Sequence, residues 1–373
     1  MTHVAAGSRL PSLDAFRGLV IVLMLLVNAA GTDPAFPAWF AHRGWNGGDM
    51  GIGLADLVYP WFLFIAGVSI PFSIERGRGA TLSPARRIVA AATRGARLYL
   101  LGVMLVAASV AYASPIGLSI LLRWDILQMI GLATLVATCA AHLPRTAQVL
   151  LVAAALLFKW AILTQVPMPG RDDVAWTATE SVQAWIRAEW GWLGTALTQG
   201  LPAAAVTVLG SLAGRELLRS DGSTRARDLL LLRGGVMATC GVAWHLLGDM
   251  PMSKDFFTSS FVLVASGTAC LLLGGMHDAF DRRGFRPPAM LVHLGTNAIA
   301  IYVFAELAWR TCLSKWLVVT PGGGASTMFV AFKAWLSHLT NPTVGAWLVV
   351  AAYIGSMCLL ALALHARGWF IRA

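Results

Sequence analysis

The stretch that decides the fold consists of two apolar segments separated by a polar one. Residues 19–30 read LVIVLMLLVNAA, residues 31–53 read GTDPAFPAWFAHRGWNGGDMGIG, and residues 54–74 read LADLVYPWFLFIAGVSIPFSI. A helix of about 20 apolar residues spans the hydrocarbon core of a bilayer. Both apolar segments fit this length once the first is extended back to residue 12, and the polar segment must then lie at one membrane surface.

The composition extends this prediction to the whole chain. Of the 373 residues, 57% are hydrophobic and 12% are charged, whereas a soluble domain has about 25% charged residues. Apolar segments recur along nearly the whole length, so we expect an all-α, polytopic transmembrane bundle of about ten helices that forms a single domain over residues 1–373. The predicted spans are 12–31, 54–75, 87–110, 118–141, 147–165, 196–217, 228–248, 258–278, 288–312 and 344–365.

The net charge of +10 indicates the orientation rather than a nucleic-acid partner, because Lys and Arg accumulate on the cytoplasmic loops of membrane proteins. With the N-terminus inside, fourteen basic residues fall on inner loops: Arg76, Arg78, Arg86, Arg87, Arg145, Arg215, Arg219, Arg225, Arg227, Arg282, Arg283, Arg286, Arg367 and Arg372. Six fall on outer loops: Arg43, Arg171, Arg187, Lys254, Lys315 and Lys333. The sequence therefore predicts that both termini are cytoplasmic.

Two further segments are predicted to lie at the outer surface. Residues 167–191 are rich in tryptophan and acidic residues and are typical of an interfacial helix. Their tryptophans fit an aromatic belt at the bilayer surface better than a sugar-stacking platform. Residues 326–340 are apolar but short and contain Lys333, so we expect a surface or re-entrant helix there.

Three polar side chains are expected at the outer mouth of the first two spans. Asn28 ends the first span, His42 lies in the loop with Trp45, and Asp56 opens the second span. A neutral imidazole can take up and return a proton near pH 7. Asn28 can orient this imidazole or hydrogen-bond an oxyanion, and Asp56 can hold His42 in one tautomer. His42, Asn28 and Asp56 are therefore the candidate catalytic residues.

Polar residues inside predicted spans are a second group. Asp125 and Gln128, which follow Arg123, and Asn297 are costly in lipid and are expected to face the bundle interior. A buried structural pair and, for Asn297, a helix–helix hydrogen bond are equally open interpretations. His245 and Asp249 are four residues apart and can pair at an outer helix end.

The inner rim also carries charge. Asp14 and Arg17 are three residues apart in the first turns of the first span, which places them on one helix face. Arg94 and Arg97 enter the third span near the same level. A local ion pair and snorkelling to lipid headgroups explain these residues, and a polyanionic ligand entering from inside requires the same guanidinium groups.

The five cysteines stand alone, with no C-x-x-C motif and no histidine at ligand spacing. We therefore predict neither a disulfide framework nor a metal site.

Several segments of the sequence resemble those of a known protein family. The opening RLPSLDAFRGLVIVLMLLVN, then HRGWNG and ADLVYPWFLFIAGVSI, resemble the heparan-α-glucosaminide N-acetyltransferase family of transmembrane acetyltransferases, in its short bacterial form. RWDILQMIGLA, MPMSKDFFTSSFVLVASG and LGTNAIAIYVFAEL extend the similarity into the C-terminal third.

The resemblance implies acetyl-CoA as the co-substrate, bound from the cytoplasmic side, with its pantetheine arm reaching through the bundle. The family's active histidine corresponds to His42 and its partner asparagine to Asn28. The acceptor expected at the outer face is a glucosamine-type amino sugar, because no stretch of the chain is long enough for the large luminal domain of lysosomal members. The implied location is the bacterial cytoplasmic membrane.

On these grounds Asp14, Arg17, Arg94 and Arg97 are the candidate contacts for the CoA nucleotide. Asp125, Gln128 and Asn297 are the candidate residues lining the passage of its arm. A secondary transporter for a sugar or organic acid is the alternative, although no inverted repeat is visible. The acceptor's identity, direct or ping-pong transfer, and the oligomeric state, a homodimer included, stay open.

Overall fold

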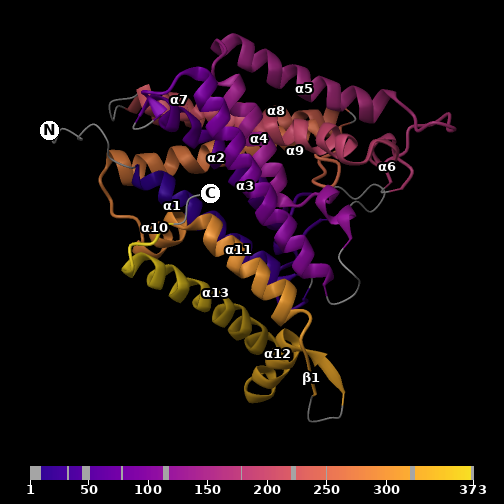
Figure 1. Cartoon of the computed structure of the whole chain (residues 1–373), viewed down its shortest axis with the longest axis vertical. Helices are drawn as coiled ribbons and strands as arrows, with labels where there is room; N and C mark the ends of the chain where they lie inside the picture. The colour runs from indigo at the N-terminus through magenta and orange to yellow at the C-terminus, as the bar shows by residue number, and fades with distance from the viewer. Residues whose placement is uncertain are drawn as a thin grey trace.

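Helices build nearly all of the molecule in the computed structural model (Figure 1). The described residues are 10–31, 33–43, 51–76, 79–111, 117–177, 179–219, 224–248, 250–319 and 324–370. The α-helices are α1 (Pro11–Ala30), α2 (Leu54–Glu75), α3 (Pro84–Val110), α4 (Ile126–Ala140), α5 (Arg145–Gln165), α6 (Val182–Thr195), α7 (Leu201–Arg219), α8 (Thr224–Leu247), α9 (Ser259–Met276), α10 (Ala289–Thr296), α11 (Ala298–Ala308), α12 (Met328–Leu339) and α13 (Pro342–Ala366).

Shorter elements connect these helices. The 3₁₀ turns are η1 (Ala38–Phe40) and η3 (Leu118–Leu122), and the π-helical turns are η4 (Ala196–Gly200), η5 (His277–Arg282) and η6 (Trp309–Leu313). The strands β1 (Leu317–Val319) and β2 (Ala325–Thr327) form a two-stranded antiparallel sheet. Since β1 and β2 have only three residues each, the predicted all-α class is confirmed.

Eight helices of the described chain are long and apolar enough to cross a membrane, and nine if a bent pair counts as one span. The bundle is therefore polytopic, as predicted. The first two predicted spans, 12–31 and 54–75, agree with α1 and α2 within one residue. A helix also forms at 328–339, within the short segment predicted at 326–340.

Three predicted spans need correction. The segment 118–141 is helical only from Ile126, because Asp125 caps the start of α4 and the preceding residues form a 3₁₀ turn. The segment 288–312 is broken at Asn297, where α10 and α11 meet at a bend of 81°. The segment 196–217 continues backwards into α6, so that 38 residues from Val182 to Arg219 form one helical stretch with a kink at Gly191.

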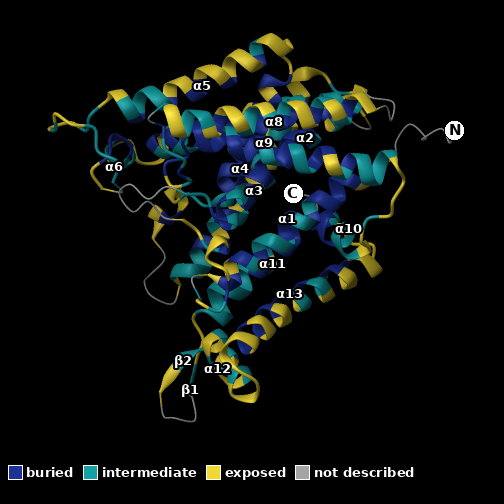
Figure 2. Ribbon diagram, turned by 180° about the vertical axis from the view of Figure 1, so that it is seen from behind, coloured by how far each residue is buried: buried dark blue, intermediate teal, exposed yellow. Residues whose placement is uncertain are grey.

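Burial separates central from peripheral helices (Figure 2). Most residues in the apolar windows of α1, α2 and α9 are buried, whereas few are buried in α3 and α8. The outward faces of peripheral helices expose large apolar side chains, such as Leu100 on α3, Leu150 and Leu157 on α5 and Leu232 on α8. Such surfaces are stable in contact with lipid tails.

The close crossing of α2 and α7 fixes the position of α2, the helix that follows the His42 loop. A Cβ atom at Gly67 would lie 2.0 Å from the carbonyl oxygen of Thr207, and one at Gly210 would lie 2.1 Å from that of Phe64. Glycine therefore lets the two backbones touch, as small residues commonly do at helix interfaces in membranes. This contact holds α2 firmly in the centre of the bundle.

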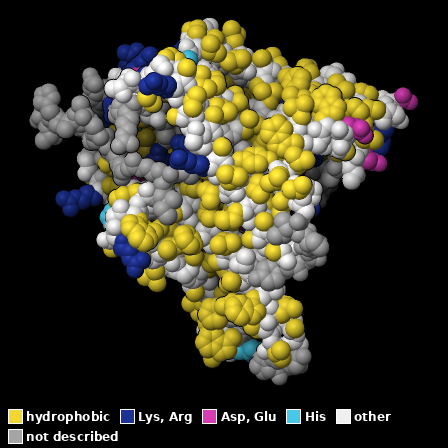
Figure 3. Space-filling view, in the orientation of Figure 1, with side chains coloured by type: hydrophobic (Ala, Val, Ile, Leu, Met, Phe, Trp, Pro, Cys, Tyr) yellow, Lys and Arg dark blue, Asp and Glu magenta, His cyan; other side chains and the backbone are white. Residues whose placement is uncertain are grey.

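Charged side chains gather at opposite edges of the molecule. In Figure 3, Lys and Arg cluster on the edge where the described chain begins, and Asp and Glu lie on the opposite edge. We call the first the Arg17 end, because α1 begins there and carries Arg17, and the second the His42 end, because the loop after α1 carries His42. The asymmetry is the pattern that the positive-inside rule describes.

Candidate active site

The loop that carries His42 is anchored to the C-terminal helices. The rings of Phe36 and Phe40 lie 4.7 Å and 6.1 Å from the ring of Trp347 on α13. Lys333 of α12 donates a hydrogen bond of 2.5 Å to Asp33. These contacts hold the part of the loop that precedes His42, which is separated from the 3₁₀ turn η1 by one residue.

Asp56 binds both the imidazole and the backbone around it. His42 Nδ1 lies 2.8 Å from Asp56 Oδ1. Asp56 Oδ2 accepts hydrogen bonds from the backbone N–H groups of Arg43 (3.1 Å) and Gly53 (2.9 Å). Asp56 is 1% exposed, while the His42 side chain is half exposed. An ionised carboxylate only accepts hydrogen bonds, so this contact places the proton on Nδ1 and leaves Nε2 as the basic atom.

The close approach of the loop to α2 depends on Gly53. A Cβ atom there would lie 1.9 Å from the carbonyl oxygen of Ala41. Gly53 is also the N-cap of α2, and its N–H is bound by the Asp56 carboxylate three residues later, as in a capping box. Asp56 therefore caps the N-terminus of α2 and also orients the His42 imidazole.

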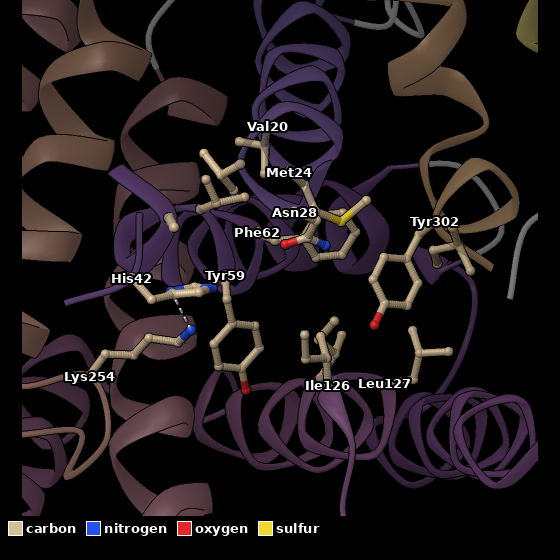
Figure 4. Close-up of a pocket in the computed structure, with 15 residues that line it drawn as sticks. Val20, Met24, Asn28, His42, Tyr59, Phe62, Ile126, Leu127, Lys254 and Tyr302 are labelled. Carbon is tan, nitrogen blue, oxygen red and sulfur yellow. Dashed lines mark hydrogen bonds between the residues drawn. The ribbon is translucent and has the colours of Figure 1, made fainter. Parts of the chain in front are cut away.

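Lys254 completes a cluster with His42 and Asp56, although it is 212 residues away in sequence. Its Nζ lies 3.1 Å from His42 Nδ1 (Figure 4). An ammonium only donates, so Lys254 hydrogen-bonds Nδ1 in the other tautomer, and with the proton on Nδ1 the contact is purely electrostatic. Burial lowers the pKa of the Lys254 ammonium, and the carboxylates of Asp56 and Asp255 act in the opposite direction. A cation here stabilises the ionised carboxylate of Asp56.

A cavity opens from this cluster into the bundle. Its walls come from α1, α2, α4 and α11, and it contains about 570 Å³ of space, its open mouth included. The polar residues in its lining are Asn28, His42, Tyr59, Lys254 and Tyr302. The lining otherwise consists of Val20, Met24, Val27, Ala55, Val58, Phe62, Ile126, Leu127, Ile130 and Ile299.

A chain of hydrogen bonds and ion pairs begins at Asn28, which lines this cavity. Asn28 Nδ2 donates to Glu306 Oε1 at 3.3 Å. Arg310 then bridges two carboxylates, Glu306 at 2.8 Å and Asp125 at 2.7 Å. Asn28 and His42 share the cavity, but the amide nitrogen of Asn28 is directed to Glu306.

Asp125, Gln128 and Asn297, which the sequence predicted to line the passage of the pantetheine arm, lie in different places in the bundle. Gln128 is 1% exposed; its amide accepts from the backbone N–H of Asp125 at 3.1 Å and donates to the carbonyl of Arg123 at 3.3 Å. Asp125 is held by Arg310 at the His42 end, and Asn297 is fully buried at the α10–α11 bend. None of the three is among the residues that line the cavity.

The predicted nucleotide contacts meet at the Arg17 end. Arg17 pairs with Asp14 at 2.8 Å and donates to Ser69 Oγ on α2 at 2.5 Å. Arg94 of α3 lies close enough to interact electrostatically with Arg17, and Arg97 is exposed one turn further along α3. Arg17 and Val20 are three residues apart on α1, so this group lies one turn below the cavity lining on the same helix face.

Some predictions concern residues outside the described ranges. Trp45 in the His42 loop, Asp249 as a partner for His245, and the loop arginines Arg78 and Arg372 all belong to this group.

Four cavity or network residues were not singled out by the sequence as part of this site: Tyr59, Lys254, Tyr302 and Arg310. The spacing of Glu306 and Arg310, four apart on one helix, was a usable signal for an ion pair inside an apolar segment. Tyr59 and Tyr302 carried no signal, because tyrosine is common in apolar helices of membrane proteins.

The fold and site together define a polytopic membrane protein with an oriented histidine at the mouth of an intramembrane cavity. A family model described as heparan-alpha-glucosaminide N-acetyltransferase, catalytic, matches residues 9–228, which is more than half of the chain. The chain belongs to this family, as the resemblance predicted. The matched region contains His42, Asn28 and Asp56, and it ends before Lys254 and α11.

Two curated relatives carry the same name. The chain is 44% identical over 73 residues to heparan-alpha-glucosaminide N-acetyltransferase of Mus musculus, covering 20% of this chain and 10% of the relative. It is 37% identical over 102 residues to that of Homo sapiens, covering 27% and 14%. Since the alignments span a small part of each relative, the activity of this chain is a separate question.

Proposed function

We propose that this protein transfers an acetyl group from acetyl-CoA to the amino group of a glucosamine-type sugar. The observation that carries the proposal is the His42–Asp56 pair, which leaves Nε2 of a half-exposed imidazole at the mouth of a cavity that reaches into the bundle. Family membership supports the reaction class.

His42 acts on the acceptor in this proposal. Its Nε2 takes a proton from the sugar amine as the nitrogen attacks the thioester carbon, and this proton is then available to the departing CoA sulfur. Asp56 holds the tautomer and stabilises the imidazolium that forms. The same free Nε2 also serves a ping-pong reaction in which the imidazole carries the acetyl group. Labelled acetyl trapped on His42 without acceptor distinguishes ping-pong from direct transfer.

The donor is proposed to enter from the Arg17 end. Arg17, Arg94 and Arg97 are the guanidinium groups for the phosphates of CoA, since guanidinium binds phosphate oxygens in bidentate fashion. Its arm is proposed to follow the α1 face from Arg17 towards Asn28, a rise of about 16 Å along the helix axis. The gathering of Lys and Arg at this end supports a cytoplasmic Arg17 end in a bacterial cytoplasmic membrane.

The test uses purified protein with radiolabelled acetyl-CoA and glucosamine. His42→Ala should bind CoA and unfold at the same temperature as the native protein, yet lose ~10²–10⁴-fold in turnover, the contribution of general acid–base catalysis. His338→Ala is the matched control, because His338 is an exposed histidine of α12. Full activity of His42→Ala contradicts the proposal.

The alternative function, a secondary transporter, is favoured by one feature. The break between α10 and α11 at Asn297 resembles the discontinuous helices of transporter sites. Uptake of unmodified labelled glucosamine into protein-containing vesicles without acetyl-CoA would support the transporter, and dependence of product on acetyl-CoA supports the enzyme.

A further inference from the structure

Two tyrosine hydroxyls in the cavity have no hydrogen-bond partner among the described residues. The hydroxyl oxygens of Tyr59 on α2 and Tyr302 on α11 are both buried, and both side chains line the cavity that His42 and Asn28 share. Figure 4 shows both hydroxyls on the side of the cavity where Ile126 and Leu127 of α4 lie. Tyr302 is 5% exposed.

An unpartnered buried hydroxyl lowers the stability of a protein, because it loses hydrogen bonds to water and gains none. Such groups are rare in native proteins and call for an explanation. Here two of them come from different helices and reach the same cavity, whose other walls are mostly apolar. Two unpartnered donors that line one largely apolar cavity fit an acceptor group on a ligand.

The surrounding charge restricts what that acceptor is. Both tyrosines lie within electrostatic range of Asp125, and Tyr302 also of Glu306. Arg310 pairs with both carboxylates, so its charge is already compensated by protein groups. This environment favours a neutral acceptor, such as a carbonyl oxygen, over a fully ionised ligand.

The other polar residues of the cavity lining, Asn28, His42 and Lys254, already contact protein groups: Lys254 Nζ lies 3.1 Å from His42 Nδ1. The amide nitrogen of Asn28 donates to Glu306, and Nδ1 of His42 is held by Asp56. A thioester carbonyl in this cavity therefore needs donors other than these, and the tyrosine hydroxyls supply them.

We propose, on the basis of the function proposed above, that Tyr59 and Tyr302 donate hydrogen bonds to the carbonyl oxygen of the acetyl thioester. The sugar nitrogen forms a bond to the carbonyl carbon, and the C–S electron pair leaves with sulfur. One proton moves from nitrogen through His42 to the CoA thiolate. The two hydroxyls stabilise the oxygen while it carries negative charge between these events, as oxyanion donors do.

Kinetics of Tyr59→Phe and Tyr302→Phe test this role. Each substitution should lower kcat by ~10²–10³-fold, the effect of removing one oxyanion donor. Neither should lower the thermal unfolding temperature, because the lost hydroxyl has no protein partner. Tyr353→Phe is the matched control: its hydroxyl donates to the carbonyl of Ala305 at 3.3 Å outside this cavity, so it should unfold at a lower temperature and keep its activity. Full activity of both cavity variants overturns the proposal.

A binding measurement separates this inference from the proposed function. In the His42→Ala protein, which leaves both tyrosines in place, acetyl-CoA should bind about tenfold more tightly than S-ethyl-CoA, which lacks the carbonyl. Adding Tyr59→Phe or Tyr302→Phe should reduce this ratio towards one. A ratio of one before any tyrosine is changed overturns the inference, even if the native protein acetylates sugars. If acetyl-CoA binds tenfold more tightly than S-ethyl-CoA but the native protein transfers no acetyl group, the carbonyl site is supported and the proposed acetyltransferase function is contradicted.

Discussion

At the His42 end, Asp56, Asp125 and Glu306 are each paired with a basic side chain that neighbouring helices or loops hold in place. At the Arg17 end, Arg17 and Arg94 lie close enough to interact electrostatically, and Arg17 is paired with Asp14. The first arrangement fixes side-chain positions, which general base catalysis requires. The second leaves positive charge in excess, which suits a polyanionic ligand. This difference supports the proposal that the two ends serve different halves of one reaction.

The largest effect is expected from a change that keeps the shape of the His42 end but alters its hydrogen bonding. In Asp56→Asn, the side-chain oxygen should stay with the backbone N–H groups of Arg43 and Gly53, so the NH₂ group turns to His42 Nδ1. The proton then moves to Nε2, the atom proposed as the base. We expect kcat to fall by ~10²–10⁴-fold, measured by acetyl transfer at saturating substrates.

Asp173→Asn is the control for this prediction. Asp173 pairs with Arg171 on the surface, and exposed pairs of this kind contribute little to stability. Its kcat should be close to that of the native protein. If Asp56→Asn is equally active, the tautomer account of the His42 end is wrong.

An intermediate effect is expected at the Arg17 end. Arg17→Gln, Arg94→Gln and Arg97→Gln should each raise the KM for acetyl-CoA by ~10–100-fold, because each removes a charge-assisted hydrogen bond to phosphate. The KM for the sugar should not change, and added salt should diminish the difference. Arg367→Gln, at the exposed end of α13, should leave both constants unchanged. Equal rises in both KM values would indicate a folding defect instead.

The smallest effect is expected from Lys254, and it appears in the pH profile. Burial lowers the pKa of the Lys254 ammonium, so this charge is lost at a lower pH than that of an exposed lysine. Because the ammonium stabilises the Asp56 carboxylate, kcat/KM should fall on the alkaline side as Lys254 loses its proton. Lys254→Met has no such proton and should lack this alkaline limb, whereas Lys254→Arg keeps its charge to higher pH and should move the limb upward. An unchanged alkaline limb in Lys254→Met would contradict this electrostatic role.

The sequence predicted helices well where apolar length alone decides, as in α1 and α2. It failed where a local polar signal competes with length. Asp125 and Gln128 form a capping box at the start of α4, and this motif was readable as a helix start. The bend at Asn297 had no comparable signal in the sequence.

The candidate site was predictable in part. His42 and Asp56 were found because they belong to one loop and the helix that follows it. Lys254 reaches His42 across 212 residues, and Tyr302 reaches the cavity from α11. Such contacts depend on the order in which helices pack, which the pattern of a single sequence does not encode. A tyrosine with an unpartnered hydroxyl is visible only in three dimensions.

The most direct test of the central claim, that the two ends bind different substrates across one membrane, uses sealed vesicles in which the orientation of the protein is known. Acetyl-CoA is supplied on the Arg17 side and labelled amino sugar on the His42 side, and the acetylated sugar is measured in each compartment. We expect product on the His42 side with this arrangement and none when the two substrates are exchanged. Equal product with both substrates confined to one compartment would contradict the claim.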